Sequence, residues 1–185
     1  MYRIMIVDDE ENILKTLKRL LMTMPCYHEG VAYRLEVETD TSPLAALERI
    51  RTTPYALVIA DYRMPELDGT AFLKQVRELQ PDSVRMILSG YPDLNGLIDA
   101  INEAQIARFI AKPWNDYELI TSIGQALAYR AMQLENLRLA NERRRDSGAL
   151  VPPPAAVETP PGAPKDRHWG PDGSAVYDDA SNWFG

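Results

Sequence analysis

The sequence has almost no cysteine and lacks any long apolar run. Its 185 residues include one cysteine, Cys26, which excludes an intramolecular disulfide and any Cys-x-x-Cys metal or redox motif. The N-terminus reads Met-Tyr-Arg, and only four apolar residues then follow before Asp8, so we expect neither a secretory signal peptide nor a membrane span there. Together these absences predict a protein of the reducing cytoplasm.

Basic residues are also in deficit. The chain carries 20 Lys and Arg against 27 Asp and Glu, a net charge of -7. Nucleic acids and anionic membranes attract positively charged surfaces, so we expect neither as the main partner. Apolar residues make up 45% of the chain and charged residues 25%, which is typical of a globular protein with a hydrophobic core.

Proline divides the chain. Seven of the 14 prolines follow residue 150, and residues 146–185 hold six acids and two bases. This stretch has too few aliphatic residues for a core, so we predict a disordered acidic tail over 146–185. The folded part is predicted to lie before it.

Short apolar runs alternate with helical periods in the folded part. The predicted strands are Arg3–Val7, Arg34–Thr39, Ala56–Ala60, Val84–Leu88 and Ala107–Ile110. The predicted helices span about 11–23, 43–52, 68–79, 94–104 and 116–145. Strands alternating with helices predict an α/β protein with a parallel five-stranded sheet covered by helices on both faces. The connection from Met24 to Tyr33 is long, and we expect an irregular or lengthened element in it.

Acidic side chains follow two of the predicted strands. Asp8, Asp9 and Glu10 come directly after the first strand, and Asp61 after the third. In an open parallel sheet, ligands bind beyond the carboxyl ends of the strands at the topological switch point, which the first and third strands flank in the order 2-1-3-4-5. Converging carboxylates repel one another unless a cation lies among them. Hard oxygen ligands with room for water favour Mg²⁺.

Two further polar residues follow the remaining strands. Ser89 comes after the fourth strand and Lys112 after the fifth. Carboxylates, a hydroxyl and a lysine at the same edge of a sheet suit phosphoryl transfer. In such a site one carboxylate is the nucleophile, while the metal and the lysine neutralise phosphoryl oxygens.

These motifs resemble the receiver domain of two-component response regulators. The matching segments are IMIVDDE, DYRMPELDG, ILSG and FIAKPW, in that order over residues 1–128. The resemblance implies a flavodoxin-like doubly wound (βα)5 fold with strand order 2-1-3-4-5. Residues 129–145 would then extend the last helix beyond the domain.

The resemblance also implies residue roles. Asp61 would be the phospho-acceptor, and Mg²⁺ would be bound by Asp8, Asp9, Asp61 and the backbone carbonyl of Arg63. Ser89 and Lys112 would contact the phosphoryl group. Phe109 would be the switch aromatic residue, which moves between exposed and buried positions.

Further expectations follow from the same family. The phosphoryl donor would be a histidine kinase, and the bond between Lys112 and Pro113 would be cis. The chain would not be an enzyme beyond self-catalysed phosphorylation and slow autodephosphorylation, and no other cofactor is expected. Because no output domain is recognised after residue 146, the signal would pass through protein contacts or dimerisation.

Other interpretations of the same residues remain open. Asp8, Asp9 and Glu10 are also common at the N-terminus of a helix, and Phe109 would suit a hydrophobic core. A constitutive scaffold that uses the long helix and the tail is the main alternative function. An α/β hydrolase with an aspartyl nucleophile is less well supported, because such enzymes commonly carry a second acid two residues after the nucleophile, where this chain has Arg63.

The last predicted helix carries an incomplete coiled-coil pattern. Positions 120, 123, 127, 130, 134, 137 and 141 follow a three-four spacing and read Ile, Ile, Leu, Arg, Leu, Leu and Asn. The apolar members favour a short coiled coil and a homodimer, although Arg130 and Asn141 weaken the pattern. The alternative is a single helix that packs its first half on the domain and frays beyond it. Beyond this helix, Trp169, Tyr177, Trp183 and Phe184 in the acidic tail are candidate anchors for a protein partner.

Overall fold

The computed structural model describes residues 1–90, 104–146, 168–169 and 175–176. The chain divides into two compact units, Met1–Arg143 and Arg144–Gly185. Besides residues 144–146, the described part of the second unit is a pair of two-residue antiparallel strands, β8 (His168–Trp169) and β9 (Ala175–Val176). The rest of the predicted tail lies outside the described residues.

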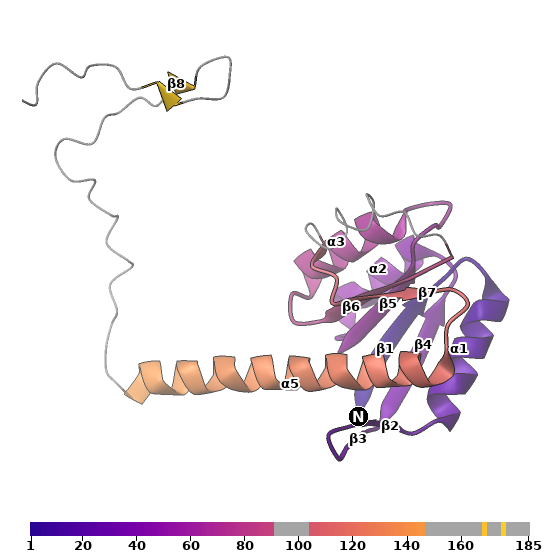
Figure 1. The fold of residues 1–185 in the computed structure, drawn as a ribbon, viewed down its shortest axis with the longest axis horizontal. Helices are drawn as coiled ribbons and strands as arrows, with labels where there is room; N and C mark the ends of the chain where they lie inside the picture. Colours follow the sequence, from indigo (N-terminus) through magenta and orange to yellow (C-terminus); the bar gives the residue numbers. More distant parts are fainter. Residues whose placement is uncertain (91–103, 147–167, 170–174, 177–185) are drawn as a thin grey trace, which may run out of the picture. The chain divides into compact units, whose positions relative to one another are not determined.

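A five-stranded parallel sheet forms the centre of the first unit (Figure 1). Its order is β4-β1-β5-β6-β7, which confirms the predicted order 2-1-3-4-5. The strands are β1 (Tyr2–Val7), β4 (Leu35–Asp40), β5 (Leu57–Asp61), β6 (Val84–Ser89) and β7 (Arg108–Ala111). Every residue of β5 and β6 is buried, as expected for central strands covered on both faces.

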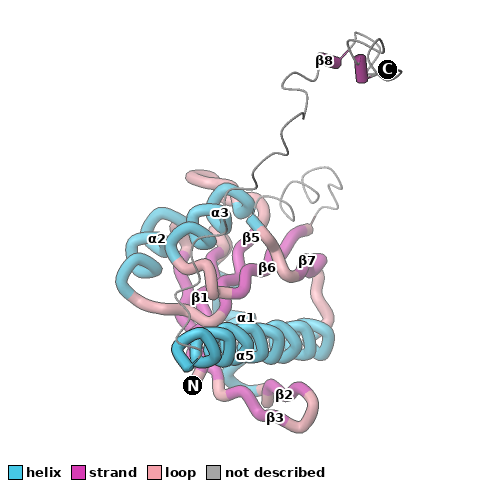
Figure 2. Tube along the Cα trace, turned by 90° about the vertical axis from the view of Figure 1, so that its left-hand side faces the viewer, coloured by secondary structure: helices cyan, strands magenta, loops and turns pink. Residues whose placement is uncertain are grey.

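Helices cover both faces of the sheet (Figure 2). They are α1 (Glu11–Thr23), α2 (Pro43–Thr52), α3 (Gly69–Leu79) and α5 (Asp116–Asp146). One apolar cluster joins the sheet to α1 and α5, and a second joins its other face to α2 and α3. Of the predicted helix over 94–104, only the helical Ala104 falls within the described residues.

The long connection after α1 is a β-hairpin. Strands β2 (Cys26–His28) and β3 (Val31–Tyr33) pair antiparallel, and both turn residues, Glu29 and Gly30, have positive φ. Such a two-residue turn matches the natural twist of a hairpin. Figure 2 shows the hairpin on the side of α5 away from the sheet.

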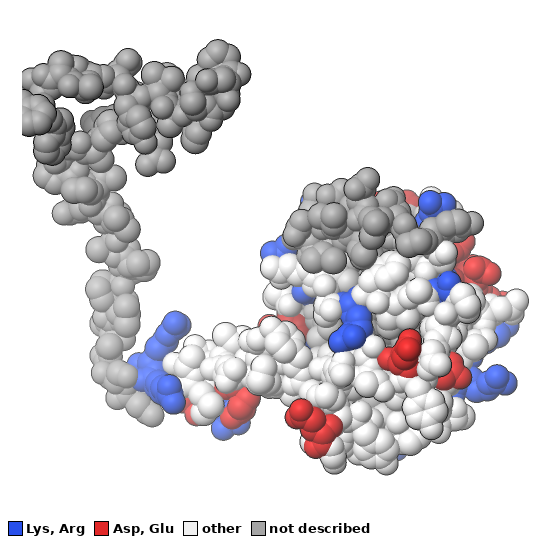
Figure 3. Space-filling model, viewed as in Figure 1, with Lys and Arg blue, Asp and Glu red and all other residues white. Residues whose placement is uncertain are grey.

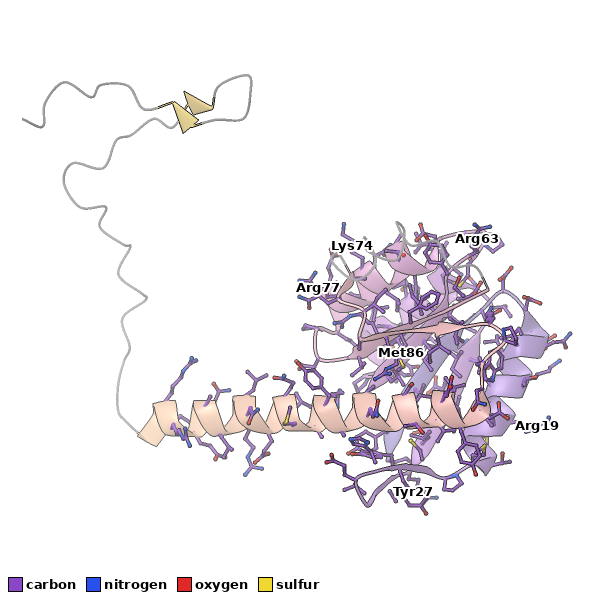
Figure 4. The ribbon with its side chains drawn as sticks, in the orientation of Figure 1. Arg19, Tyr27, Arg63, Lys74, Arg77 and Met86 are labelled. Carbon is purple, nitrogen blue, oxygen red and sulfur yellow. The ribbon has the colours of Figure 1, made fainter. Side chains whose placement is uncertain are left out.

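The hairpin packs closely against α5. The Cys26 thiol lies 3.7 Å from the carbonyl oxygen of Ile120, and burial raises the pKa of this thiol to about 11. A Cβ atom at Gly124 would lie 2.7 Å from the carbonyl oxygen of Tyr27. Figure 4 shows the Tyr27 ring pointing away from the domain. Helix α5 is therefore held between the sheet and the hairpin.

Helix α5 runs from Asp116 to Asp146, almost as predicted. One side of its first half is buried, whereas residues 131–145 are exposed apart from the half-buried Leu134. The first three positions of the predicted coiled-coil pattern, Ile120, Ile123 and Leu127, are at most 6% exposed within the domain core. Those three positions therefore cannot serve a partner helix. Among the described residues, no helix is long and apolar enough to cross a membrane.

Candidate functional site

The predicted site residues lie at the carboxyl ends of adjacent strands. Asp8 directly follows β1, Asp61 ends β5, Ser89 ends β6 and Lys112 directly follows β7. The parallel register aligns Asp61 with Leu88 and Ser89 with Ala111. Because parallel strands end at the same edge of a sheet, these four side chains come from one edge, as the sequence predicts.

Three carboxylates converge at this edge. One carboxylate oxygen from each of Asp8, Asp9 and Asp61 lies within 4.8 Å of the others. Asp8 is fully buried, Asp61 is 7% exposed and Asp9 is exposed. Carboxylate oxygens are the ligands that Mg²⁺ prefers, and the exposure of Asp9 leaves access for the water ligands that this ion retains. The cluster therefore fits a magnesium ion.

Lys112 bridges two of these carboxylates. Its Nζ lies 2.7 Å from Oδ2 of Asp8 and 2.6 Å from Oδ1 of Asp61. Burial acts to lower the pKa of Lys112, but the hydrogen bonds to Asp61 and Asp8 outweigh burial and raise it overall. Lys112 therefore stays protonated and places a positive charge beside the predicted phospho-acceptor.

For Asp8, burial outweighs the hydrogen bonds. Burial is the main influence and raises the pKa of Asp8, while the hydrogen bonds from Lys112 and from the Glu10 amide partly offset it. The Glu10 N–H donates to Oδ1 of Asp8 at 2.9 Å. A buried carboxylate of this kind is stabilised in its charged form by a nearby cation.

The structure does not favour the helix-cap interpretation of these acids. Glu10 occupies the N-cap position of α1, and its side chain makes no capping hydrogen bond. The Asp8 carboxylate instead accepts from the Glu10 amide and the Lys112 ammonium. Asp8 is therefore part of the acidic cluster and does not occupy the N-cap position of the helix.

Other predicted residues lie beside the cluster. The Arg63 N–H donates to Oδ2 of Asp61 at 3.2 Å, which brings the backbone of Arg63 close to the carboxylates. Ser89 is 3% exposed, and Phe109 is half-buried against the second apolar cluster. The bond between Lys112 and Pro113 is cis, as predicted.

Gly69 has a role that sequence reasoning missed. A Cβ atom at this position would lie 2.1 Å from the carbonyl oxygen of Asp61. The absent side chain thus allows α3 to begin directly against the end of β5, where Asp68 caps the helix by accepting from the Ala71 amide at 2.9 Å. Asp68 and Gly69 belong to the segment DYRMPELDG, but the sequence alone does not indicate this close approach.

A second missed feature is an apolar pocket next to the site. Ile13, Lys112, Pro113 and Trp114 line it, and it has a volume of about 490 Å³. Ile13 lies on α1, and the other three residues belong to the loop between β7 and α5. The sequence offered Trp114 as part of a motif without indicating this pocket.

Comparisons with known proteins agree with this geometry. Residues 4–124 match the response regulator receiver domain family. The hydrogenase transcriptional regulatory protein HoxA of Cupriavidus necator is 34% identical over 147 residues, which cover 80% of this chain and 28% of that protein. The chain thus spans less than a third of the length of this relative.

Solved structures give the same result. The signal receiver domain of an HD domain-containing protein from Pseudomonas fluorescens is 31% identical, with a TM-score of 0.65 over 72% of this chain and 92% of that one. A CheY-like receiver domain protein from Methanospirillum hungatei is 28% identical, with a TM-score of 0.64 over 72% and 98%. With the fold, the site and these matches in agreement, the chain belongs to the response regulator receiver domain family.

Proposed function

We propose that the chain accepts a phosphoryl group on Asp61 from a histidine kinase, and that Mg²⁺ is bound by Asp8, Asp9, Asp61 and the carbonyl of Arg63. The observation that carries this proposal is the position of Lys112, whose Nζ contacts both Asp8 and Asp61 within 2.7 Å. The three carboxylates within 4.8 Å support the metal. Family membership supports the kinase as donor.

The reaction forms one bond and breaks one. A carboxylate oxygen of Asp61 attacks phosphorus, and the bond between phosphorus and the kinase histidine nitrogen breaks, which leaves an acyl phosphate on Asp61. Bound Mg²⁺ would supply charge neutralisation for the phosphoryl oxygens. The ammonium of Lys112 leaves its contact with the free carboxylate and pairs with a phosphoryl oxygen. The chain is thus a reactant that turns over only through slow autodephosphorylation.

The new phosphoryl group would act as a switch. Ser89 ends β6 and pairs in register with Ala111 of β7, while Phe109 pairs with Ile87 two residues earlier. A shift of Ser89 and Lys112 toward the phosphoryl group would therefore reach Phe109 and the face formed by β7 and α5. A change from 1% to 99% of the active conformation requires about 5.5 kcal/mol of differential stabilisation.

We propose proteins as the partners in the cytoplasm, with no nucleic acid or membrane. The kinase would dock at the pocket formed by Ile13, Pro113 and Trp114, because this pocket adjoins Lys112. The signal would leave through a downstream protein or a second copy of the chain. Exposed apolar side chains on α5, namely Tyr129, Leu137 and Leu139, support this route.

Incubation with Mg²⁺ and a small-molecule phosphodonor tests the proposal. Wild type should gain one phosphoryl group by intact mass, and Asp61→Asn should gain none. Asp68→Asn is the matched control, because Asp68 caps α3 and lies in the same loop but outside the acidic cluster; it should react like wild type. Phosphorylation of Asp61→Asn at the same site, or wild-type reaction that chelation of Mg²⁺ leaves unchanged, would contradict the proposal.

The scaffold alternative is favoured by one observation, the exposure of apolar residues along the second half of α5. Under that alternative, partner binding depends on the helix and the tail and not on Asp61. Once a partner is identified, removal of residues 147–185 should abolish binding while Asp61→Asn has no effect. The reverse pattern would support the phosphorylation switch.

A further inference from the structure

Helix α5 changes environment at Arg130. Before this residue, Ile123 and Leu127 are fully buried against the sheet. After it, the helix continues to Asp146 with exposed side chains on most of its circumference. Arg130 marks the exit, because its Nε donates to the carbonyl oxygen of Asp82 in the loop that precedes β6.

The apolar stripe that packs on the sheet continues beyond this exit. Leu134 and Leu137 follow Leu127 and Arg130 at helical spacing, so they lie on the same side of α5. Both line a cleft of about 510 Å³ between the helix and the base of the sheet. The other walls include Pro81, Val84, Ala107 and Tyr129. Leu134 is half-buried and Leu137 is 55% exposed. In a single copy of the domain, these two leucine side chains are therefore only partly covered.

A second copy cannot use this stripe in a symmetric parallel arrangement. In such a dimer, residues of equal number lie level with each other, so the partner's residues 116–130 would occupy the space where this copy's own sheet covers Ile123 and Leu127. The arrangement would also place two Arg130 guanidinium groups against each other. Sterics and like charge thus both oppose it.

An antiparallel arrangement removes the contact between the two Arg130 side chains and confines the steric conflict to the last turn of each helix. If the symmetry axis passes between Glu135 and Asn136, Leu134 of each copy lies level with Leu137 of the other. Arg130 then lies level with Asn141 of the other copy, whose carboxamide oxygen accepts hydrogen bonds. The four residues of the stripe overlap over 130–141, about 18 Å. Only residues 142–146 of the other copy then reach the level of residues 125–129, where the sheet covers the helix, compared with residues 116–130 in the parallel pair.

We propose that two copies of the chain associate through residues 130–141 of α5 in antiparallel orientation, each filling the other's cleft with its Leu137 and Asn141. The spacing Arg130, Leu134, Leu137, Asn141 reads symmetrically about its centre, as a two-fold contact requires. This inference gives a definite geometry to the self-association in the proposed function, on which it rests.

Dipolar distance measurements between spin labels distinguish the two orientations. Labels would be attached to the full chain at Ala131→Cys, Asn136→Cys or Ala140→Cys, one site at a time. The native Cys26 can be retained, because it is 3% exposed and burial raises its pKa to about 11, so it reacts slowly with the label. Wild type treated with the same label measures the background signal from Cys26. In the antiparallel pair, the two labels are offset along the helix by roughly 14, 2 and 14 Å respectively.

The shortest intermolecular distance should therefore be at residue 136, with longer distances on both sides. Equal distances at all three positions would show a parallel pair, and the absence of an intermolecular signal would show a monomer; either result overturns the inference. Phosphorylation of the same samples is read separately by intact mass. If the distances do not fit an antiparallel pair while phosphorylation is normal, the result counts against the inference alone. If Asp61 is not phosphorylated, the result counts against the proposed function.

Substitutions test the residues that the inference names. Leu134→Gln and Leu137→Gln should each weaken self-association at least about tenfold in sedimentation experiments, because each loses a buried apolar side chain in both copies. Met132→Gln is the matched control, since Met132 is 53% exposed on another side of the same helix. Equal weakening by Met132→Gln, or no weakening by either leucine variant, would contradict the assigned face.

Discussion

Gly69 lies where an added methyl group has no space. Its Cβ would meet the Asp61 carbonyl oxygen at 2.1 Å and the Tyr62 Cα at 3.1 Å, so backbone atoms must move. We expect Gly69→Ala to destabilise the domain by about 1–3 kcal/mol, although alanine favours helices by about 1 kcal/mol, and to slow phosphorylation of Asp61. Urea unfolding and intact-mass time courses measure the two effects.

The control for this variant is Gly90→Ala. Apart from its chain neighbours, no residue in the described part of the chain comes within 4 Å of a Cβ built at Gly90, so this substitution should leave the free energy of unfolding almost unchanged. If Gly69→Ala proved as stable as Gly90→Ala and phosphorylated at the wild-type rate, α3 would not position Asp61 in the way that the close contact indicates.

The buried hydroxyl of Tyr55 leads us to expect a loss of stability at alkaline pH. It is 2% exposed, and its hydroxyl donates to Oε2 of Glu38 at 2.7 Å. Burial, followed by this hydrogen bond to Glu38, raises the pKa of Tyr55 above its ordinary value near 10. Because the folded state holds the proton more tightly than the unfolded state does, the stabilisation is complete below pH 10 and is lost as the pH rises through the folded-state pKa.

Urea unfolding between pH 8 and pH 11 measures this effect. Above pH 10, the free energy of unfolding of wild type should fall more steeply than that of Tyr55→Phe, by at most about 1.4 kcal/mol per pH unit for one group. The difference between the two proteins isolates Tyr55 from the other tyrosines and the lysines. Parallel curves would show that Tyr55 ionises equally in both states.

At the residue scale, the sequence was enough to predict which polar side chains meet at the site, but it was not enough to predict the close packing contacts around them. Asp8, Asp61, Ser89 and Lys112 could be placed because each lies at the end of an apolar strand, and parallel strands end at one edge. Gly69 could not be assigned its role, since the distance between α3 and β5 depends on how the helix packs. The capture of Lys112 by two carboxylates likewise depends on side-chain geometry that spacing alone does not fix.

At the scale of the element, the β2–β3 hairpin and α5 depend on each other. Gly124 is the point of contact, with a Cβ position 2.7 Å from the Tyr27 carbonyl oxygen and 3.4 Å from the His28 Cβ. We expect Gly124→Ala to lower the free energy of unfolding, although glycine to alanine in an exposed helix normally raises it by up to about 1 kcal/mol. Faster hydrogen exchange of the hairpin amides should accompany the loss.

Thr121→Ala serves as the matched control, because Thr121 lies one turn earlier on α5 and is exposed. It should leave the free energy of unfolding equal or slightly higher and the hairpin exchange unchanged. If Gly124→Ala raised the free energy of unfolding and the hairpin amides exchanged at the wild-type rate, the hairpin would move to accommodate the methyl group and would not hold the helix in place.

The elements themselves were largely predictable. Four of the five strands of the main sheet contain an apolar run of at least three residues, whereas β4 alternates apolar and polar residues. Ser42 and Pro43 mark the start of α2. The hairpin was expected only as a lengthened connection, because Cys26–His28 and Val31–Tyr33 are too short for a strand pattern. The first half of the coiled-coil pattern fits the alternative of a helix packed on its own domain, because Ile120, Ile123 and Leu127 are buried in the domain core. A spacing pattern alone cannot distinguish the domain's own sheet from a partner helix.

At the scale of the whole molecule, the two ends of the strands in the main sheet carry different features. The carboxyl edge holds the acidic cluster and Lys112. The opposite edge holds the cleft and Arg130, where α5 leaves the domain. Figure 3 shows basic side chains gathered at the far end of α5, where Arg143, Arg144 and Arg145 follow one another. Such charges favour the C-terminal end of a helix through its dipole.

Truncation after Arg130 tests this division of the molecule. Beyond Arg130, no described residue of α5 is buried, and Leu134 alone is half-buried. We therefore expect residues 1–130 to fold cooperatively, with the acidic cluster intact and Asp61 phosphorylated at close to the wild-type rate. Because the truncated protein lacks Leu134 and Leu137, its midpoint of thermal unfolding should not depend on protein concentration.

The full chain should behave differently in the same experiment. Association of two folded copies stabilises the folded state by mass action, so its midpoint should rise with concentration, and Leu137→Gln should remove most of that rise. If the truncated domain unfolded non-cooperatively, the second half of α5 would belong to the core despite its exposure. If truncation left the concentration dependence in place, self-association would instead use a surface within residues 1–130, and the exposed leucines of α5 would need another partner.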